Sequence, residues 1–271
     1  MSIKNKHLQG SDPGGAVGFE VYGHRGSTLL APENTVEAFE LALGYRVDVL
    51  EIDVRLSRDG EVIVTHDERV DRTCNGQGKV AELSLKDLKK LDAGYHFVDL
   101  NGQHYRNQGV RLPTLSELFE RFPTTRINID IKDNSQKAAL AVADCINRAD
   151  KTTLTNVGSF HAEALAHFRK ALPSVTTAAT QSEVAKLYFG RQLVQSFDYQ
   201  YLQIPVSFFA LPLATRRFIQ LAKSQGIGVV YWTVNEKESM QKLMSLGATG
   251  VVTDRPDLAM ELLHPADAVH S

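Results

Sequence analysis

Short apolar runs alternate along the chain with longer runs in which apolar residues recur every three or four positions. The first pattern is typical of buried strands and the second of amphipathic helices. Strands are predicted at 19–23, 48–55, 62–66, 126–132, 152–158, 175–180, 201–205, 228–234 and 250–253. Helices are predicted at 35–45, 84–91, 114–122, 135–148, 162–171, 183–189, 212–225, 236–246 and 256–263. This alternation favours βα units around a parallel sheet.

About eight such units in about 240 residues fit an α/β fold of the closed TIM (β/α)8 barrel type, with an open doubly wound sheet as the alternative. Residues 67–112 depart from this alternation of strands and helices, because the only element predicted there is the short helix at 84–91. We therefore expect one barrel domain over residues 16–263, with a small insertion after the second βα region, within about 67–112. Residues 1–15 and 264–271 lack periodicity and are expected to be loose termini.

Composition narrows the class of protein. The 271 residues are 43% hydrophobic, and 30 Lys and Arg stand against 32 Asp and Glu. The net charge of −2 argues against a protein that coats nucleic acid or a membrane surface, so no nucleic-acid partner is expected. The first twenty residues contain no apolar stretch that could serve as a signal peptide, and no window of 18 apolar residues exists that could span a bilayer. Cys74 and Cys145 show no pairing motif and are predicted to be buried thiols in a reducing compartment, so we expect a cytoplasmic location.

Acidic side chains interrupt two of the predicted strands. Glu51 and Asp53 are two positions apart and therefore leave one face of a strand. Asn128, Asp130 and Lys132 share a face of another strand in the same way. Strands of a parallel barrel are normally apolar on both faces, so these polar faces are expected at the wet C-terminal mouth, where barrel sites lie. The alternative is an exposed edge strand with solvated charges.

Three carboxylates at one mouth would repel one another and raise their own pKa values. One bound divalent metal ion would relieve this repulsion. All-oxygen ligands favour Mg²⁺ or Ca²⁺, with Mn²⁺ as a further candidate, over Zn²⁺. In a metal-free alternative Lys132 neutralises one of the acids, and it could equally contact a phosphate beside the metal.

Histidines follow two of the predicted strands. His24, with Arg25 beside it, comes directly after the first strand, and His66 ends another. Both are expected to project over the barrel mouth. A single histidine at a strand end is more often structural, but two of them near an arginine and three acids favour catalysis. An imidazole pKa of about 6.5 suits general acid and base work near neutral pH.

Several ordered motifs run through nearly the whole chain, from about residue 22 to about residue 263. They are His24-Arg25-Gly26, Pro32-Glu33-Asn34-Thr35, Glu51-Ile52-Asp53-Val54, Ser57-Arg58-Asp59-Gly60, His66-Asp67, Arg72-Thr73, Leu112-Pro113-Thr114-Leu115, Asn128-Ile129-Asp130-Ile131-Lys132, Trp232-Thr233-Val234-Asn235 and Thr253-Asp254-Arg255-Pro256. Together they resemble the glycerophosphodiester phosphodiesterase family. The resemblance implies a TIM-barrel enzyme, a phosphoric diester hydrolase, that uses a bound divalent metal to convert glycerophosphodiesters to sn-glycerol 3-phosphate and an alcohol.

The resemblance also implies roles, position by position. The metal ligands of the family correspond to Glu51, Asp53 and Asp130. The catalytic acid and base correspond to His24 and His66. Phosphate-contacting positions correspond to Arg25 and Lys132, and Glu33 matches a further site residue.

One position departs from the family pattern. The third ligand is usually Glu, whereas this chain has Asp130, which is one methylene shorter, so the metal must shift or a water must intervene. Residues 121–132 are similar to a branch that includes lysophospholipase D enzymes. The alternative function is therefore a lysophospholipase D-type lipid phosphodiesterase that releases lysophosphatidic acid.

The expected chemistry is general acid and base catalysis on a small-molecule substrate. One histidine would remove a proton from the nucleophile and the other would protonate the leaving alcohol oxygen. The nucleophile is either water or the glycerol 2-hydroxyl, and the sequence leaves this choice, the metal, the assignment of the two histidines and the oligomeric state open. The rival classes are a metal-dependent aldolase or isomerase, which would usually need a Schiff-base lysine or an enolate-forming base, and a non-catalytic binding barrel.

Two further residues are candidates for substrate contact. Trp232 either packs against the glycerol or lipid part of the substrate or caps the barrel core, and Gln203 is a weaker candidate at the mouth. The apolar residues of segment 208–213 are expected to pack against the insertion, with contact to an acyl chain as the alternative.

Two turns are interpreted as helix starts. Asn34 or Thr35 is able to cap the helix at 35–45. Asp254 is interpreted as the capping acid of the last strand-to-helix turn. Both turns are therefore expected to be mainly structural.

Overall fold

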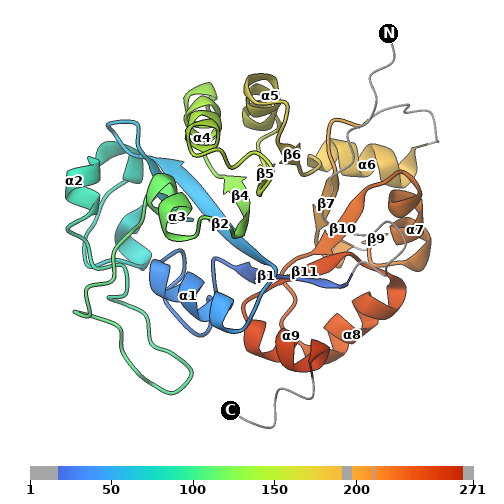
Figure 1. Cartoon of the computed structure of the whole chain (residues 1–271), viewed down its shortest axis with the longest axis horizontal. Helices are drawn as coiled ribbons and strands as arrows, with labels where there is room; N and C mark the ends of the chain where they lie inside the picture. Colours follow the sequence, from blue (N-terminus) through green and yellow to red (C-terminus); the bar gives the residue numbers. More distant parts are fainter. Residues whose placement is uncertain (1–17, 191–196, 210, 265–271) are drawn as a thin grey trace.

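In the described part of the chain, residues 18–190, 197–209 and 211–264, eight parallel strands form a barrel with helices around it (Figure 1). The predicted loose termini lie outside these ranges, apart from residue 264. The barrel strands are β1 (Glu20–His24), β2 (Val49–Leu56), β4 (Arg126–Ile131), β5 (Thr155–Gly158), β6 (Thr176–Thr177), β7 (Tyr201–Ile204), β10 (Gly228–Tyr231) and β11 (Gly250–Thr253).

The order of the strands around the barrel is β6-β5-β4-β2-β1-β11-β10-β7. The two ends of this sheet meet where Ala178, just after β6, pairs with Tyr201 at the start of β7. The N–H of Ala179 also donates to the Tyr201 carbonyl O at 2.8 Å. This pairing closes the sheet, so the predicted TIM barrel is confirmed and the open doubly wound sheet is not formed.

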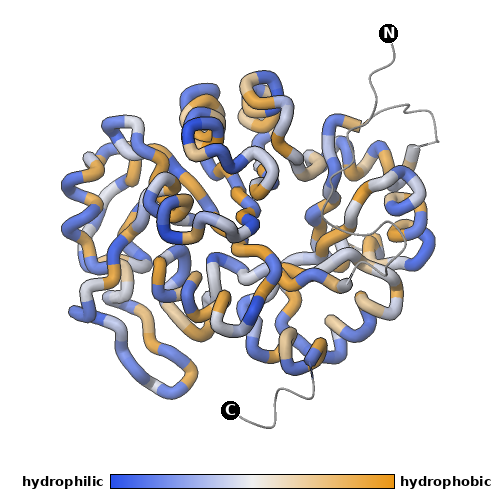
Figure 2. The backbone as a smooth tube through the Cα atoms, in the orientation of Figure 1, coloured by the Kyte–Doolittle hydropathy of each residue, from blue (hydrophilic) through white to orange (hydrophobic). Residues whose placement is uncertain are grey.

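Helices cover the outside of the barrel. They are α1 (Val36–Gly44), α3 (Leu115–Arg121), α4 (Gln136–Arg148), α5 (Ala162–Ala171), α6 (Gln181–Phe189), α7 (Arg216–Ser224), α8 (Lys237–Leu246) and α9 (Pro256–Leu263). A threonine or serine side chain accepts a backbone N–H at the start of α1, α3, α4, α6 and α7. In Figure 2 the helices alternate between hydrophobic and hydrophilic residues, because one face of each packs on the sheet.

The strand predicted at 62–66 forms, but it is not part of the barrel wall. β3 (Val62–Val64) runs antiparallel to the end of β2, with Val64 opposite Val54. The chain thus turns back along β2, and the Thr65 N–H donates to the Asp53 carbonyl O at 2.9 Å. His66 therefore reaches the mouth from a returning hairpin rather than from the end of a parallel strand.

The insertion lies between β3 and α3, inside the second βα unit, on the left of Figure 1. It contains two 3-10 turns, Val70–Arg72 and Val80–Glu82, and the short helix α2 (Leu85–Leu88). A small apolar core of its own holds it together, formed by Ile63, Val70, Cys74, Val80, Leu88, Ala93, Val110 and Leu112. The insertion is therefore a packed layer beside the mouth and not a loose loop.

A short hairpin, β8 (Ser207–Phe208) and β9 (Leu211–Pro212), follows β7 on the mouth side. Cys74 and Cys145 are buried free thiols, as predicted. Among the residues that the structure describes, no helix combines the length and the apolar character needed to cross a bilayer.

Candidate active site

The polar faces of β1, β2 and β4 meet in two adjacent rows at the C-terminal mouth of the barrel. In the first row His24 pairs with Glu51, which pairs with Asn128. In the next row Asp53 lies opposite Asp130. All five residues line a cavity of about 430 Å³. The acidic faces therefore lie at the mouth and not on an exposed edge strand.

Lys132 lies between two of the carboxylates. Its Nζ is 2.9 Å from Asp53 Oδ1 and 2.7 Å from Asp130 Oδ2. Burial alone would raise the pKa of Asp53, but the charges of Lys132 and Arg25 outweigh it and hold this pKa below its usual value. Burial and the neighbouring Asp53 carboxylate raise the pKa of Glu51 to about 7. Lys132 thus compensates part of the negative charge that the acids would otherwise concentrate here.

The carboxylates offer oxygen donors of the kind that a hard divalent cation prefers. Asp130 Oδ1 is buried without a hydrogen-bond partner, and burial raises the pKa of this carboxyl. An orphaned buried acceptor is costly unless a cation or a donor meets it. Within the described ranges no three Asp, Glu, His or Cys side chains converge on one point, and Lys132 stands between Asp53 and Asp130. The donor set of Glu51, Asp53 and Asp130 fits Mg²⁺ or Ca²⁺ in chemical type.

Asp254 holds the first histidine. His24 Nδ1 is 2.5 Å from Asp254 Oδ1, so Nε2 is the ring nitrogen left for the cavity that His24 lines. Asn235 fixes Asp254 in turn, because its Nδ2 donates to Asp254 Oδ2 at 2.8 Å and its Oδ1 accepts the Asp254 N–H at 2.9 Å. Burial would lower the pKa of His24, but the hydrogen bond to Asp254 and the charge of Glu51 outweigh it and raise this pKa.

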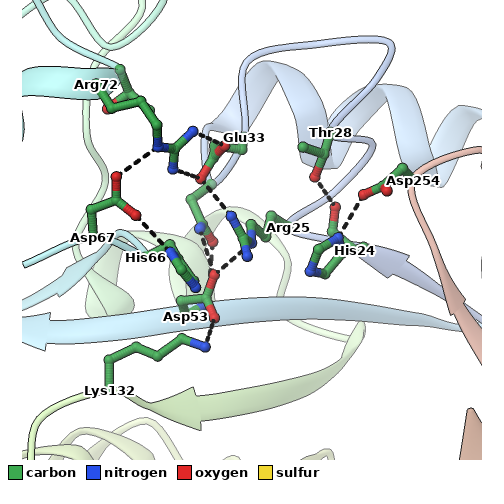
Figure 3. A network of polar contacts seen from close by, with 12 residues as sticks. His24, Arg25, Thr28, Glu33, Asp53, His66, Asp67, Arg72, Lys132 and Asp254 are labelled. Carbon is green, nitrogen blue, oxygen red and sulfur yellow. Dashed lines mark hydrogen bonds and ion pairs between the residues drawn. The ribbon is translucent and has the colours of Figure 1, made fainter. Parts of the chain in front are cut away.

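The insertion holds the second histidine, as Figure 3 shows. His66 Nδ1 is 2.7 Å from Asp67 Oδ1, and Arg72 Nε donates to Asp67 Oδ2 at 2.6 Å. Arg72 belongs to the first 3-10 turn of the insertion. Both histidines therefore have Nδ1 on a carboxylate that a further polar residue fixes.

Glu33 joins two arginines at the edge of the site (Figure 3). Its Oε1 accepts from Arg25 Nη1 at 2.8 Å, and both of its oxygens accept from Arg72 at 2.7 Å. Burial would raise the pKa of Glu33, but the arginines outweigh it and lower this pKa. Arg25 Nε lies 2.9 Å from Asp53 Oδ2. Glu33 is not among the residues that line the cavity, so it acts on the site by holding Arg25.

Two residues that were interpreted as helix caps hold site residues instead. The start of α9 follows Arg255 without a side-chain cap, so the capping role predicted for Asp254 is wrong. At the start of α1 the cap is Thr35, which accepts the Ala38 N–H. Asn34 brackets Asp53, since its Nδ2 donates to Asp53 Oδ2 at 3.0 Å and its Oδ1 accepts the Asp53 N–H at 3.2 Å. Sequence reasoning missed these contacts because each joins distant segments.

Gln203 lines the same cavity from β7. Its Nε2 donates to Asn128 Oδ1 at 2.6 Å, and Asn156 Nδ2 donates to the same oxygen at 2.6 Å. These amides connect β4, β5 and β7 across the inside of the barrel. Gln203 is therefore hydrogen-bonded to Asn128 in this structure. Asn156, which was not a candidate from the sequence, is hydrogen-bonded to the same residue.

One wall of the cavity is apolar. It includes Phe160, Tyr188, Phe208, Leu211, Leu213 and Trp232. The Phe160 ring is 5.7 Å from the Trp232 ring and 5.5 Å from Lys132 Nζ, so it stands where the apolar wall meets the charged residues. Figure 1 places β9 and the insertion on opposite sides of the barrel, so the prediction that segment 208–213 packs against the insertion is wrong.

Comparison with known proteins points to one family. Residues 24–258 match the model of the glycerophosphoryl diester phosphodiesterase family. A glycerophosphodiester phosphodiesterase of Caldanaerobacter subterraneus is 30% identical over 253 residues, which cover 90% of this chain and 97% of that protein. A human lysophospholipase D is 27% identical over 270 residues, with 89% and 85% covered. A phosphodiesterase structure from Oleispira antarctica, in complex with the product sn-glycerol-3-phosphate, is 27% identical with a TM-score of 0.76, and 90% of this chain and 96% of that chain are covered.

Proposed function

The chain belongs to the glycerophosphoryl diester phosphodiesterase family and is a phosphoric diester hydrolase; we propose that it cleaves glycerophosphodiesters to sn-glycerol 3-phosphate and an alcohol, with one divalent metal ion and with His24 and His66 as acid and base. The observation that carries this proposal is the pair of imidazoles lining one cavity, each with Nδ1 on a carboxylate. The product complex of the Oleispira antarctica relative supports glycerol 3-phosphate as the retained group.

A phosphodiester anion repels nucleophiles, so the site must first neutralise its charge. Arg25 and Lys132 both line the cavity and would contact the phosphate oxygens. Glu33 holds the Arg25 guanidinium before substrate arrives, which lowers the cost of orienting it. Glu51, Asp53 and Asp130 would hold the metal. When bound, that ion supplies Lewis-acid charge at the phosphoryl group.

The two histidines move the protons. Since Nδ1 of each ring is engaged by Asp254 or Asp67, Nε2 is the atom that meets the substrate. One imidazole accepts the proton of the nucleophile, and the other donates a proton to the leaving alcohol oxygen. The carboxylate behind each ring keeps its orientation and stabilises the imidazolium that forms.

The experiment that tests this proposal follows the phosphorus products by ³¹P NMR. Chelator-stripped protein is incubated with glycerophosphocholine, with and without Mg²⁺ or Ca²⁺. Glycerol 3-phosphate is expected only when metal is restored. In the same assay His24→Ala and His66→Ala should release little product, with His161→Ala as their control, since His161 is exposed at the start of α5 and makes no side-chain cap. No product in the presence of demonstrably bound metal would overturn the proposal.

The apolar wall of the cavity favours a second candidate function, a lysophospholipase D-type reaction. A lysophospholipid joins the same phosphodiester to an acyl chain, and Tyr188, Phe208 and Leu211 would face that chain. The likeness to a human lysophospholipase D supports this candidate. The same NMR assay with lysophosphatidylcholine decides it. Lysophosphatidic acid from this substrate, with no product from glycerophosphocholine, would establish the lipid reaction, and the reverse would exclude it.

A further inference from the structure

We propose that the edge of the cavity docks on the surface of a phospholipid bilayer, an interaction that goes beyond the proposed hydrolysis. This edge is formed by the end of α6 and by the β8–β9 hairpin with the residue before it. We call it the apolar rim, and its exposed apolar side chains are Phe189, Val206, Phe208, Phe209 and Leu211.

The apolar rim exposes several large apolar side chains together. Such clusters are uncommon on the surfaces of soluble monomeric proteins. Phe209 is 90% exposed, Phe189 65% and Phe208 48%. In the sequence, residues 205–213 contain one polar side chain, Ser207, and no charge. The exposure is therefore not a single surface leucine or phenylalanine but a concentrated patch of aromatic rings.

The rim side chains lie close together in space. The rings of Phe208 and Phe209 are 4.8 Å apart, and those of Tyr188 and Phe189 are 5.0 Å apart. The hydroxyl of Tyr188 donates to the Pro212 carbonyl O at 3.3 Å, which ties the end of α6 to the hairpin. Two segments distant in sequence thus form one surface.

The backbone of the hairpin beneath the rim forms hydrogen bonds within the protein, as a backbone in an apolar environment requires. Ser207 pairs with Pro212, and Phe208 with Leu211, across the hairpin. The N–H groups of Leu213 and Ala214 both donate to the carbonyl O of Val206, at 3.1 and 3.0 Å. Backbone groups that enter an apolar medium must be paired within the protein, since an unpaired group costs several kcal/mol. These bonds pair part of the hairpin backbone and therefore lower the cost of placing it at the membrane interface.

The backbone also holds the most exposed ring in a costly conformation. Phe209 has a φ of +51°, in the left-handed region that a bulky residue rarely adopts. Such conformations persist where the surrounding structure maintains them and are concentrated at functional sites. A phenylalanine kept there and left 90% exposed contributes little to packing within the chain. Its place at the hairpin therefore indicates a contact outside the chain.

The continuity of the rim with the cavity argues for lipid as the occupant. Phe189, Phe208 and Leu211 are exposed at the rim and also line the cavity that holds the two histidines. An amphiphile leaving a bilayer would therefore meet apolar side chains before it reached the charged residues. Phe and Leu side chains are typical of the apolar faces by which proteins bind at the membrane interface. A second copy of the chain would need a self-complementary patch, whereas Phe209 stands clear of the surface around it.

Sedimentation of the full-length protein with phosphatidylcholine vesicles, and with equimolar phosphatidylcholine and phosphatidylglycerol vesicles, tests this proposal. Phe209→Ser removes the exposed ring and leaves the cavity lining intact, because Phe209 is not a lining residue. Leu100→Ser is the matched control, since Leu100 is 59% exposed in the insertion. Wild type and Leu100→Ser should sediment with vesicles, whereas Phe209→Ser should bind about tenfold more weakly or worse.

Two results would overturn the proposal: wild type that sediments with neither vesicle, or Phe209→Ser that binds as well as wild type. Light scattering on the same samples identifies the competing occupant, because a wild-type dimer that Phe209→Ser converts to a monomer would make the rim a self-interface. Turnover of soluble glycerophosphocholine should be equal in all three proteins, which also shows that they are folded. Loss of that turnover in every protein, with vesicle binding kept, would contradict the proposed function alone.

Discussion

Nδ1 of His24 lies 2.5 Å from Oδ1 of Asp254, although 230 positions separate the two residues. Closure of the barrel makes this contact, because it pairs β1 with β11, with Gly23 opposite Thr253. His24, the last residue of β1, and Asp254, the first residue after β11, therefore lie beside each other at the mouth. Asp254 is not itself among the residues that line the cavity and acts on the site through His24, so it is a positioning residue for His24.

Asp254→Asn should slow the reaction by changing how His24 is held. The amide no longer supplies the negative charge that stabilises the imidazolium, so we expect kcat to fall by about 10²-fold with KM little changed. Steady-state kinetics on glycerophosphocholine measures both constants. Asp257→Asn is the control, since Asp257 pairs with Arg255 at 2.7 Å, away from His24. An unchanged kcat in Asp254→Asn, or an equal loss in the control, would remove the positioning role.

Replacement of either histidine should affect kcat more than binding. His24→Ala and His66→Ala are each expected to lower kcat by about 10²–10⁴-fold, which is the usual share of acid and base catalysis. Circular dichroism and the thermal midpoint check that each variant is folded. Near wild-type turnover in both folded variants would show that other groups carry the protons.

Removal of one carboxylate should weaken metal binding independently of turnover. Asp130 Oδ1 is buried without a hydrogen-bond partner, and the charge of the ligand set governs affinity for Mg²⁺ and Ca²⁺. Asp130→Asn should therefore bind either ion about tenfold more weakly or worse, whereas Asp130→Glu should retain binding. Isothermal titration calorimetry of the chelator-stripped proteins gives the affinities. Equal affinity in wild type and Asp130→Asn would show that Asp130 is not a ligand.

Glu183 should make the stability of the fold depend on pH. Arg169 Nη1 donates to Glu183 Oε1 at 2.8 Å, and the Thr180 N–H donates to Oε2 at 2.7 Å. Burial would raise the pKa of Glu183, but these donors outweigh it and hold the pKa below the ordinary 4.5. A carboxyl with a lowered pKa stabilises the folded state above its unfolded pKa. That contribution is lost as the pH falls through the folded pKa.

Glu183→Gln should therefore lower the free energy of unfolding by about 1 kcal/mol near neutral pH. The difference from wild type should shrink as the pH falls below about 4. Urea unfolding at two pH values measures it, with Glu163→Gln as the control, because Glu163 is exposed in the first turn of α5. A difference that stays constant with pH would mean that the amide disturbs packing rather than charge.

The sequence alone was sufficient to predict the helices and strands. It was also sufficient to predict which polar side chains share one face of a strand. Helix and strand periods differ, so the apolar pattern located the strands and helices of the barrel within a few residues. The two-residue period of a strand places Glu51 and Asp53 on one face, and this follows from local geometry alone. The motifs along the chain also sufficed to indicate the family, which the match of residues 24–258 to the family model confirms.

Which side chains meet depends on the tertiary structure. The sequence has no local signal for the pairing of Asp53 with Asp130, since strand register depends on how all eight strands close. The contacts of Asp254 with His24 and of Asn34 with Asp53 also have no local signal in the sequence. Nor does the sequence indicate the hairpin that places His66 at the mouth. Short polar residues at turns bond equally well to their own backbone or to a distant partner. Barrel closure, and not local preference, selects between these partners, so the helix caps were interpreted correctly only where the partner is local.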